Sequence, residues 1–217
     1  QMCRELGIDL VITDHHECKD TLPDAVAVVD PHRPDGGYPH KNLSGVGVAF
    51  KLAAALHGNQ AEILRRYADM VCLGTVADVM PLVGENRVFV ARGLESLKYT
   101  NRPGIAALMQ ESGCTPEAVN ASSIGFMLAP RINAGGRLED ASQGVLLLTA
   151  PDAATADPIA MHLEEANSQR QAMEQDITQQ ALSMIPECVD FLTDRVIILM
   201  GEGWNHGVIG LAAGRIC

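Results

Sequence analysis

The chain has 217 residues, of which 47% are hydrophobic and 4% aromatic, and its formal net charge at pH 7 is −11. This length suits one large domain, or one and a half smaller ones. No apolar run reaches the roughly 18 residues of a membrane span. The first residues lack the basic end and the apolar core of a signal peptide. A net charge this negative argues against a general nucleic-acid-binding protein.

The negative charge is concentrated in the C-terminal third. Residues 141–217 hold three basic and ten acidic residues, whereas residues 1–140 hold thirteen basic and seventeen acidic ones. A local basic groove in the first 140 residues is therefore compatible with the composition. The six cysteines are scattered without a C-x-x-C pair, so we expect reduced thiols in a cytoplasm and no zinc site.

The first half of the chain predicts strands that alternate with helices, an α/β layer architecture. Residues 1–7 are typical of a helix end closed by Gly7. Residues 8–13 form an apolar run typical of a buried parallel strand, and residues 25–29 (AVAVV) predict a second strand. Helices are predicted over residues 44–57, with Ser44 near the N-cap, and over 60–80, 87–98 and 103–112.

The second half predicts a long helix followed by the start of another unit. Residues 152–187 carry a helical apolar stripe, and Asp157 and Pro158 suit the N-cap and first position of that helix. Val196–Met200 predicts a new buried strand, and residues 201–216 predict a loop that leads into a helix. We divide the chain into a first domain (1–150) that lacks its N-terminal part, a connector helix (151–190) and the beginning of a truncated domain (191–217).

Residues 8–18 read IDLVITDHHEC, so that a strand ends in Asp14, His15 and His16. In open α/β sheets the ligand crevice lies beyond the carboxyl ends of the strands. Imidazoles and carboxylates suit divalent metal ions, and Asp14 can accept an imidazole N–H and fix its tautomer. Side chains 15 and 16 diverge in a tight turn, so one can bind a metal while the other faces a substrate. The alternative is a polar helix cap with exposed histidines.

An acidic residue also interrupts the apolar run LGTVADVMPL at residues 73–82. A buried carboxylate is costly unless it is paired or bound to a metal. Asp78 is therefore a candidate metal ligand. The alternative is that Asp78 caps a turn before Pro81.

Residues 129–141 read APRINAGGRLEDA and are expected to form a loop. Arg131 and Arg137 flank Asn133 and two glycines. Glycines let backbone amides approach an anion, and arginines make bidentate contacts with phosphates. This stretch predicts a phosphate site. The alternative is a loop between helices with surface arginines.

The only tryptophan, Trp204, lies in the glycine-rich stretch GWNHGVIG at residues 203–210. A helix N-terminus that follows can bind phosphate, and an indole can stack on a nucleobase. A core tryptophan is the alternative.

These four motifs together resemble the DHH phosphoesterase superfamily and, within it, the RecJ family of single-strand-specific DNA exonucleases. Residues 14–16 are the DHH signature, and GTVADVMPL (74–82) is similar to a later aspartate motif of the family. PRINAGGR (130–137) is similar to a RecJ motif, and GEGWNHGVIG (201–210) resembles the opening of a DHHA1 domain. The resemblance covers nearly the whole chain, and the last two motifs, joined by a long helix, are its most specific part.

The resemblance implies a phosphodiesterase with two divalent metal ions, Mn²⁺ or Mg²⁺, that degrades single-stranded DNA from the 5′ end in DNA repair and recombination. His15 and Asp78 are then metal ligands, His16 contacts the scissile phosphate, and Asp14 orients the histidines. The implied nucleic-acid and phosphate contacts are Arg131, Asn133, Gly136, Arg137, Trp204, Asn205, His206 and Gly207.

Two metal-binding motifs that the family places upstream of the DHH signature are missing from the chain. Gly135 and Asn205 stand where the family often has Ala and His. We expect a fragment that is inactive alone, although its parent chain is active. The resemblance implies single-stranded DNA, a single-strand-binding protein and a helicase as partners, no membrane, and a cytoplasmic location.

Three other functions fit parts of the same pattern. The first is an oligonucleotide or cyclic-dinucleotide phosphodiesterase of the superfamily, which activity on di- to pentanucleotides would distinguish. The second is a non-catalytic nucleic-acid-binding module, against which the presence of His15, His16 and Asp78 argues. The third is a relative of inorganic pyrophosphatases, for whose small substrate the motifs at 130–137 and 201–210 serve no purpose.

Overall fold

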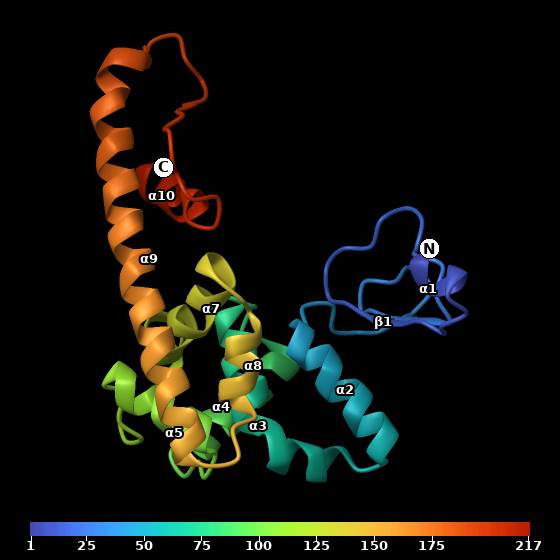
Figure 1. Cartoon of the computed structure of the whole chain (residues 1–217). Helices are drawn as coiled ribbons and strands as arrows, with labels where there is room; N and C mark the ends of the chain where they lie inside the picture. The colour runs from blue at the N-terminus through green and yellow to red at the C-terminus, as the bar shows by residue number, and fades with distance from the viewer. The chain divides into compact units, whose positions relative to one another are not determined.

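The computed structural model describes residues 1–217, and the chain forms two compact units. Unit 1 comprises Gln1–Asn101 and Cys114–Ala129, and unit 2 comprises Arg102–Gly113 and Pro130–Cys217. The chain is mainly helical and has one small parallel sheet (Figure 1). None of its helices combines the length and the apolarity that crossing a membrane requires.

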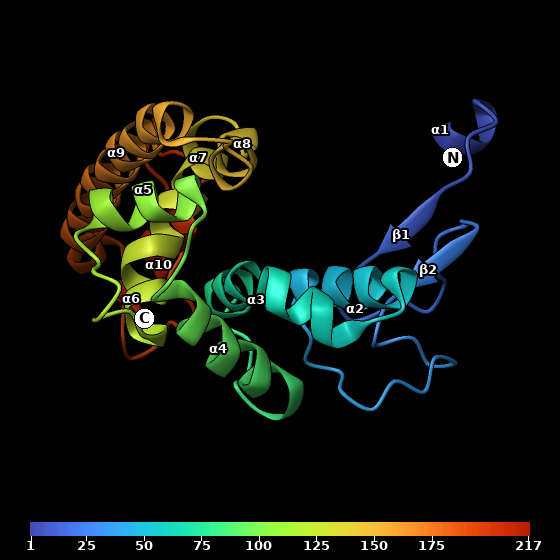
Figure 2. The same cartoon turned by 90° about the horizontal axis from the view of Figure 1, so that it is seen from below.

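The sheet of unit 1 consists of β1 (Val11–Thr13) and β2 (Ala27–Val29), which pair in parallel with Val11 opposite Ala27. The two strands run side by side in Figure 2. They follow a short helix, α1 (Met2–Glu5), and Gly7 leaves that helix with a left-handed φ of 66°. The predicted parallel strands are confirmed, but both are shorter than the apolar runs that predicted them. The prediction that the first strand is buried was wrong, because the residues of β1 and β2 are exposed or half-buried in this two-stranded sheet.

Three helices of unit 1 form its core, and they confirm the predicted helices in this region. They are α2 (Gly45–His57), α3 (Gln60–Ala77) and α4 (Gly84–Leu97), and α3 packs against both of the others. Ser44 caps α2, as predicted, because its Oγ accepts a hydrogen bond from the Gly47 amide at 3.2 Å. The side chains buried between these helices include Leu43, Val48, Phe50, Ile63, Val71 and Phe89.

Unit 1 also contains a short helix, α6 (Ala121–Ser123), that continues into a π-helix, η1 (Ile124–Leu128). The π-helix packs against α3.

Unit 2 is built along one long helix, α9 (Ala153–Cys188). Helices α5 (Pro103–Ser112), α8 (Ser142–Leu148) and α10 (Ile209–Ile216) all pack against it (Figure 1). The predicted helix 103–112, the long helix and the final helix are therefore confirmed. The domain boundaries at residues 150 and 190 stay a prediction.

Two predictions in this region were wrong. The N-cap of α9 is Asp152, whose carboxylate accepts from the Thr155 amide at 2.9 Å, and Pro158 lies inside the helix. Asp157 therefore does not start the helix. Val196–Met200 forms no strand, because no second strand offers it hydrogen-bonding partners, and Val196 and Ile198 are 72% and 84% exposed.

The glycine-rich motif at residues 129–141 is also different from the prediction. Residues Ala129–Leu138 form helix α7 instead of a loop. Alanine, arginine, leucine and isoleucine in the motif are tolerated in helices, and the two adjacent glycines cost too little to break a helix that is packed on its neighbours.

Candidate metal and phosphate site

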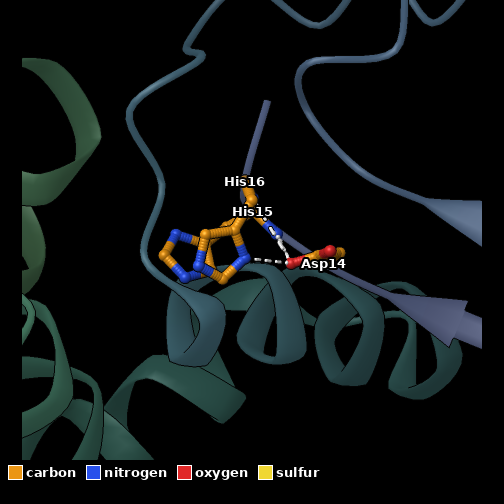
Figure 3. Close-up of side chains that lie close together, drawn as sticks. All are labelled: Asp14, His15 and His16. Atoms are coloured by element: carbon orange, nitrogen blue, oxygen red, sulfur yellow. Dashed lines mark hydrogen bonds and ion pairs between the residues drawn. The ribbon is translucent and has the colours of Figure 1, made fainter. Parts of the chain in front are cut away.

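The DHH turn is organised around one carboxylate oxygen. Asp14 continues the sheet by donating its amide to the Val29 carbonyl at 3.0 Å. Its Oδ1 then accepts from the His15 amide at 2.7 Å and the His16 amide at 3.3 Å, and lies 2.7 Å from His16 Nδ1 (Figure 3). Because Nδ1 is held by Asp14, the Nε2 atom of His16 is left to meet a ligand.

The hydrogen bond between Asp14 and His16 shifts the pKa values of the two side chains in opposite directions. The hydrogen bond from the His16 side chain, helped by the two backbone amides, lowers the pKa of Asp14 to about 2. In return, the hydrogen bond to Asp14 raises the pKa of His16. An exposed, protonated imidazole is a good partner for a phosphate oxygen. The predicted role of Asp14 as the residue that orients a histidine therefore fits His16.

His15 points to a different partner. Its side chain is 17% exposed, and its Nε2 lies 3.5 Å from Oδ2 of Asp78. The ring lies against the first turn of α2, where a Cβ added to Gly45 would come within 3.4 Å of His15 Cδ2. The imidazole rings of His15 and His16 are neighbours, with centroids 4.3 Å apart (Figure 3). The His15 imidazole therefore lies beside Asp78, and the His16 imidazole lies beside Asp14.

Asp78 is the residue at which α3 ends, and it is 43% exposed at the side chain. It faces His15 because α2 and α3 are held tightly together. Ser44 Oγ and Thr75 Oγ1 are 3.0 Å apart and buried. A Cβ on Gly74 would lie only 2.6 Å from a methyl group of Val46, so only glycine allows this approach.

The donor set suits a divalent cation. One ligand atom from each of Asp14, His15 and His16 lies within 4.8 Å of the others, and the carboxylate of Asp78 faces His15. A neutral imidazole with carboxylate oxygens is a ligand set that Mn²⁺ accepts, and carboxylates also suit Mg²⁺. The residues therefore fit such an ion, with His15 and Asp78 as the pair best placed to bind it.

One carboxylate near this turn was not among the residues predicted from the sequence. Asp30 follows β2 just as Asp14 follows β1, so the carboxyl ends of both parallel strands bear an acid. Its Oδ1 accepts from the His32 amide at 2.7 Å, and its charge adds to the effect of Asp14 in raising the pKa of His16. An acid directly after the predicted strand 25–29 is the sequence signal that could have identified it.

In unit 2, helix α7 presents part of the predicted phosphate site on one face. Asn133, Gly136 and Arg137 are exposed and lie three and four residues apart, which places them on the same side of the helix. The predicted cradle of free glycine amides is wrong, because helical amides are engaged with carbonyls four residues earlier. Any anion binding by this motif therefore falls to the side chains.

The second glycine-rich motif touches this helix directly. The Arg137 guanidinium donates to the Gly207 carbonyl at 2.9 Å, and a Cβ on Gly207 would lie 2.4 Å from the Arg137 carbonyl oxygen. Asn205 accepts from the Gly207 amide at 2.8 Å, and His206 is exposed. The structure thus brings together two motifs that are some 70 residues apart in the sequence.

Two other predicted contact residues are engaged with α9. Arg131 has a side chain that is 13% exposed and forms an ion pair with Glu164. The Trp204 indole N–H donates to Gln180 Oε1 at 2.9 Å, and the ring packs beside the small core around Ile177. The packing of Trp204 resembles that of a core tryptophan, and its contact with a base stays a prediction.

Comparison with known proteins agrees with this geometry. Residues 1–75 match the DHH family, N-terminal domain, a segment that includes both strands and the Asp14–His16 turn.

The resemblance extends over the rest of the chain. The chain is 42% identical over 216 residues to the single-stranded-DNA-specific exonuclease RecJ of Bacillus subtilis strain 168, a match that covers 100% of this chain and 27% of that protein. The crystal structure of RecJ in complex with Mn²⁺ from Thermus thermophilus matches with a TM-score of 0.83 and 35% identity, covering 99% of this chain and 32% of that one. The Mg²⁺ complex from the same organism matches with a TM-score of 0.78 and 34% identity, over 97% and 31% of the two chains.

The chain is therefore similar to RecJ proteins along nearly its whole length, and it spans about a third or less of the length of these relatives.

Proposed function

We propose that this chain carries part of the active site of a metal-dependent phosphodiesterase that degrades single-stranded DNA from the 5′ end in DNA repair and recombination. The observation that carries the proposal is the approach of His15 Nε2 to the Asp78 carboxylate at 3.5 Å, next to an imidazole that Asp14 holds ready for a phosphate. The relatives support it, since they are RecJ exonucleases and two of their structures contain Mn²⁺ or Mg²⁺.

Each residue of the turn has a distinct part in this proposal. His15 and Asp78 would hold a divalent ion, and bound ions would supply Lewis-acid activation of water and neutralise charge on the phosphoryl oxygens. Asp14 fixes the His16 tautomer and favours its protonated form. His16 then binds a non-bridging oxygen of the scissile phosphate and keeps it next to the ion site.

The proposed contacts with the rest of the strand come from unit 2. Arg137 and Asn133 offer a guanidinium and an amide on one face of α7. Both suit phosphate oxygens, and Arg137 is kept in place by the Gly207 carbonyl. Arg131 would have to exchange Glu164 for a phosphate before it could contribute.

The proposal also includes the cytoplasm as the site of action, with a single-strand-binding protein and a helicase as working partners. All six cysteines are free thiols, which suits a reducing compartment. Fractionation of cells that carry a tagged natural protein, followed by capture of bound proteins after nuclease treatment, tests both statements.

The experiment that tests the activity uses the natural protein that carries these residues. A long single-stranded DNA labelled at its 5′ end is incubated with Mn²⁺, and labelled mononucleotides should appear early. Asp78→Asn should lower the cleavage rate at least about 100-fold, since it removes a charged ligand. Asp157→Asn, on an exposed turn of α9, is the control and should leave the rate unchanged. Cleavage restricted to di- to pentanucleotides, or full activity of Asp78→Asn, would overturn the proposal.

A further inference from the structure

We propose that Phe126 is a base-stacking residue, which holds a nucleobase of the DNA strand near the end of α3 that bears Asp78. This inference rests on the proposed function and adds a contact with the base to the contacts with metal and phosphate. It concerns unit 1 alone.

The Phe126 ring is exposed to solvent, while the backbone segment that carries it is anchored by buried neighbours and a capping box. Phe126 is 83% exposed, whereas Ile124 and Leu128, at the two ends of η1, are fully buried. A capping box fixes the turn before them: Asn120 Oδ1 accepts from the Ser123 amide at 3.0 Å, and Ser123 Oγ accepts from the Asn120 amide at 2.8 Å. The segment is therefore anchored on both sides of an outward-facing aromatic ring.

The backbone of this segment has the unusual form that marks many functional sites. Residues Ile124–Leu128 form a single π-helical turn that interrupts the helical stretch from α6 to α7. Such turns are rare and are frequently found at functional sites. In this turn Ile124 and Leu128 are buried, while Phe126 between them faces water.

The position of this turn connects it with the metal site. The π-helix packs against α3, and a Cβ on Gly125 would lie 3.8 Å from a methyl group of Val76. Val76 lies two residues before Asp78, at the C-terminal end of α3. Val79, the residue after Asp78, is itself 86% exposed. Exposed apolar side chains thus accompany the carboxylate on this end of the helix.

A nucleobase is the part of the substrate that such a surface suits. Phenylalanine has no hydrogen-bonding group, so it cannot read the sequence, but every base has a π-face on which it can stack. A nuclease that removes successive nucleotides needs this kind of sequence-tolerant contact close to the scissile phosphate. Phe126 therefore supplies affinity for the base, while Asp14–His16 and Asp78 handle the phosphate.

The test compares intact DNA with DNA that lacks bases. The natural protein and its variants Phe126→Ala and Phe126→Trp are given oligo(dT) of equal length, either intact or abasic at the first nucleotides from the 5′ end. Phe126→Ala should raise KM for the intact strand about 5- to 150-fold, the effect of losing one stacked base. It should leave KM for the abasic strand nearly unchanged, and Phe126→Trp should behave like the wild type. Tyr99→Ala, which removes a 79% exposed aromatic residue just beyond α4, is the matched control and should have no effect.

The outcomes separate this inference from the proposed function. An equal loss on intact and abasic strands, or a drop in melting temperature without any change in base discrimination, would show that Phe126 is structural and would overturn the inference. If the wild type cleaves neither strand, the proposed function fails. Anisotropy of labelled oligo(dT) without metal still tests Phe126 in that case, because stacking needs no cleavage: a Phe126→Ala variant that binds intact and abasic strands in the wild-type ratio would refute it.

Discussion

Val79 is the one residue other than glycine with a left-handed backbone, at φ 54°. A β-branched side chain is poorly suited to this conformation, which costs about 1–2 kcal/mol for residues with a Cβ. The strain lies directly after Asp78, where the chain leaves α3. Because Val79 is 86% exposed, packing of its side chain offers little in return. The left-handed turn is therefore maintained by its surroundings, and it fixes the direction in which the chain leaves Asp78.

Replacing Val79 by a residue that accepts this conformation should stabilise the protein. Val79→Asn is expected to raise the free energy of unfolding by about 1 kcal/mol, because asparagine is the residue after glycine that best tolerates a left-handed φ. Urea unfolding followed by circular dichroism measures the change. Val88→Asn, at a 51% exposed position inside α4, should instead lower the stability slightly. A loss of stability in Val79→Asn as large as in Val88→Asn would contradict the argument from strain.

Single residues of the site were predictable where their neighbours in sequence carried the signal. Asp14, His15 and His16 are contiguous after a strand, so their proximity follows from the sequence, and Asp78 was visible as an acid in an apolar run. The partner of His15 was less accessible, because the approach of His15 to Asp78 depends on how α2 packs against α3. Asp30 was missed for the same reason: its place beside Asp14 becomes clear only when the two strands pair.

On the scale of elements, a partly buried network joins α2, α4 and the loop before them. Tyr38 donates its hydroxyl to Glu85 at 2.6 Å, and Lys51 forms an ion pair with the other oxygen of the same carboxylate. Burial by itself would raise the pKa of Glu85, but the hydrogen bonds from Lys51 and Tyr38 outweigh it and hold that pKa below its usual range. The ionised form of Glu85 is therefore the one that stabilises the fold.

The sign of the pH dependence follows from this lowered pKa. The contribution of Glu85 is complete above the pKa it has in the unfolded chain, near 4.5, and is lost as the pH falls through the lower pKa of the folded state. Glu85→Gln should cost about 1–2 kcal/mol at pH 7, as expected for a charged hydrogen-bonded pair with partial exposure. The difference from the wild type should shrink as the pH falls below about 4.5. Urea titrations at pH 7, 5, 4 and 3 measure this, with Glu95→Gln of the exposed Lys98 pair as control. A difference that stays constant with pH would exclude the ionic origin.

Helices and strands were predicted correctly where the sequence pattern that specifies them lies within the element itself. Helices α2, α3, α5 and α9 follow from apolar periodicity, and α2 also follows from its Ser44 cap; their predicted ranges lie close to the observed ones. The strand at Val196–Met200 was wrong because a strand exists only with a partner, and none pairs with this run. The helix at Ala129–Leu138 was predicted as a loop because two adjacent glycines disfavour a helix locally. Tertiary packing, which stabilises most helices in proteins, is not visible in the local sequence.

On the scale of the whole molecule, the balance of ligands and charge limits what these 217 residues can do alone. The described chain contains one cluster of three potential metal-binding groups, Asp14, His15 and His16, and Asp78 adds a carboxylate beside it. Two ions that share a phosphate need more carboxylate ligands than this cluster provides. The net charge of −11 further opposes the approach of DNA from a distance.

We therefore expect the isolated chain to bind metal weakly and to cleave no DNA, whereas the proposed function requires the natural protein that carries these residues to do both. Isothermal titration of the isolated chain with Mn²⁺ should show binding that Asp78→Asn weakens, because the carboxylate facing His15 is a ligand in this proposal. The labelled single strand should stay intact over the time in which the natural protein degrades it. Cleavage by the isolated chain that disappears in its Asp78→Asn variant would show instead that these residues form a sufficient active site. In that event the single ion held by His15 and Asp78, with His16 on the phosphate, would be the whole catalytic requirement.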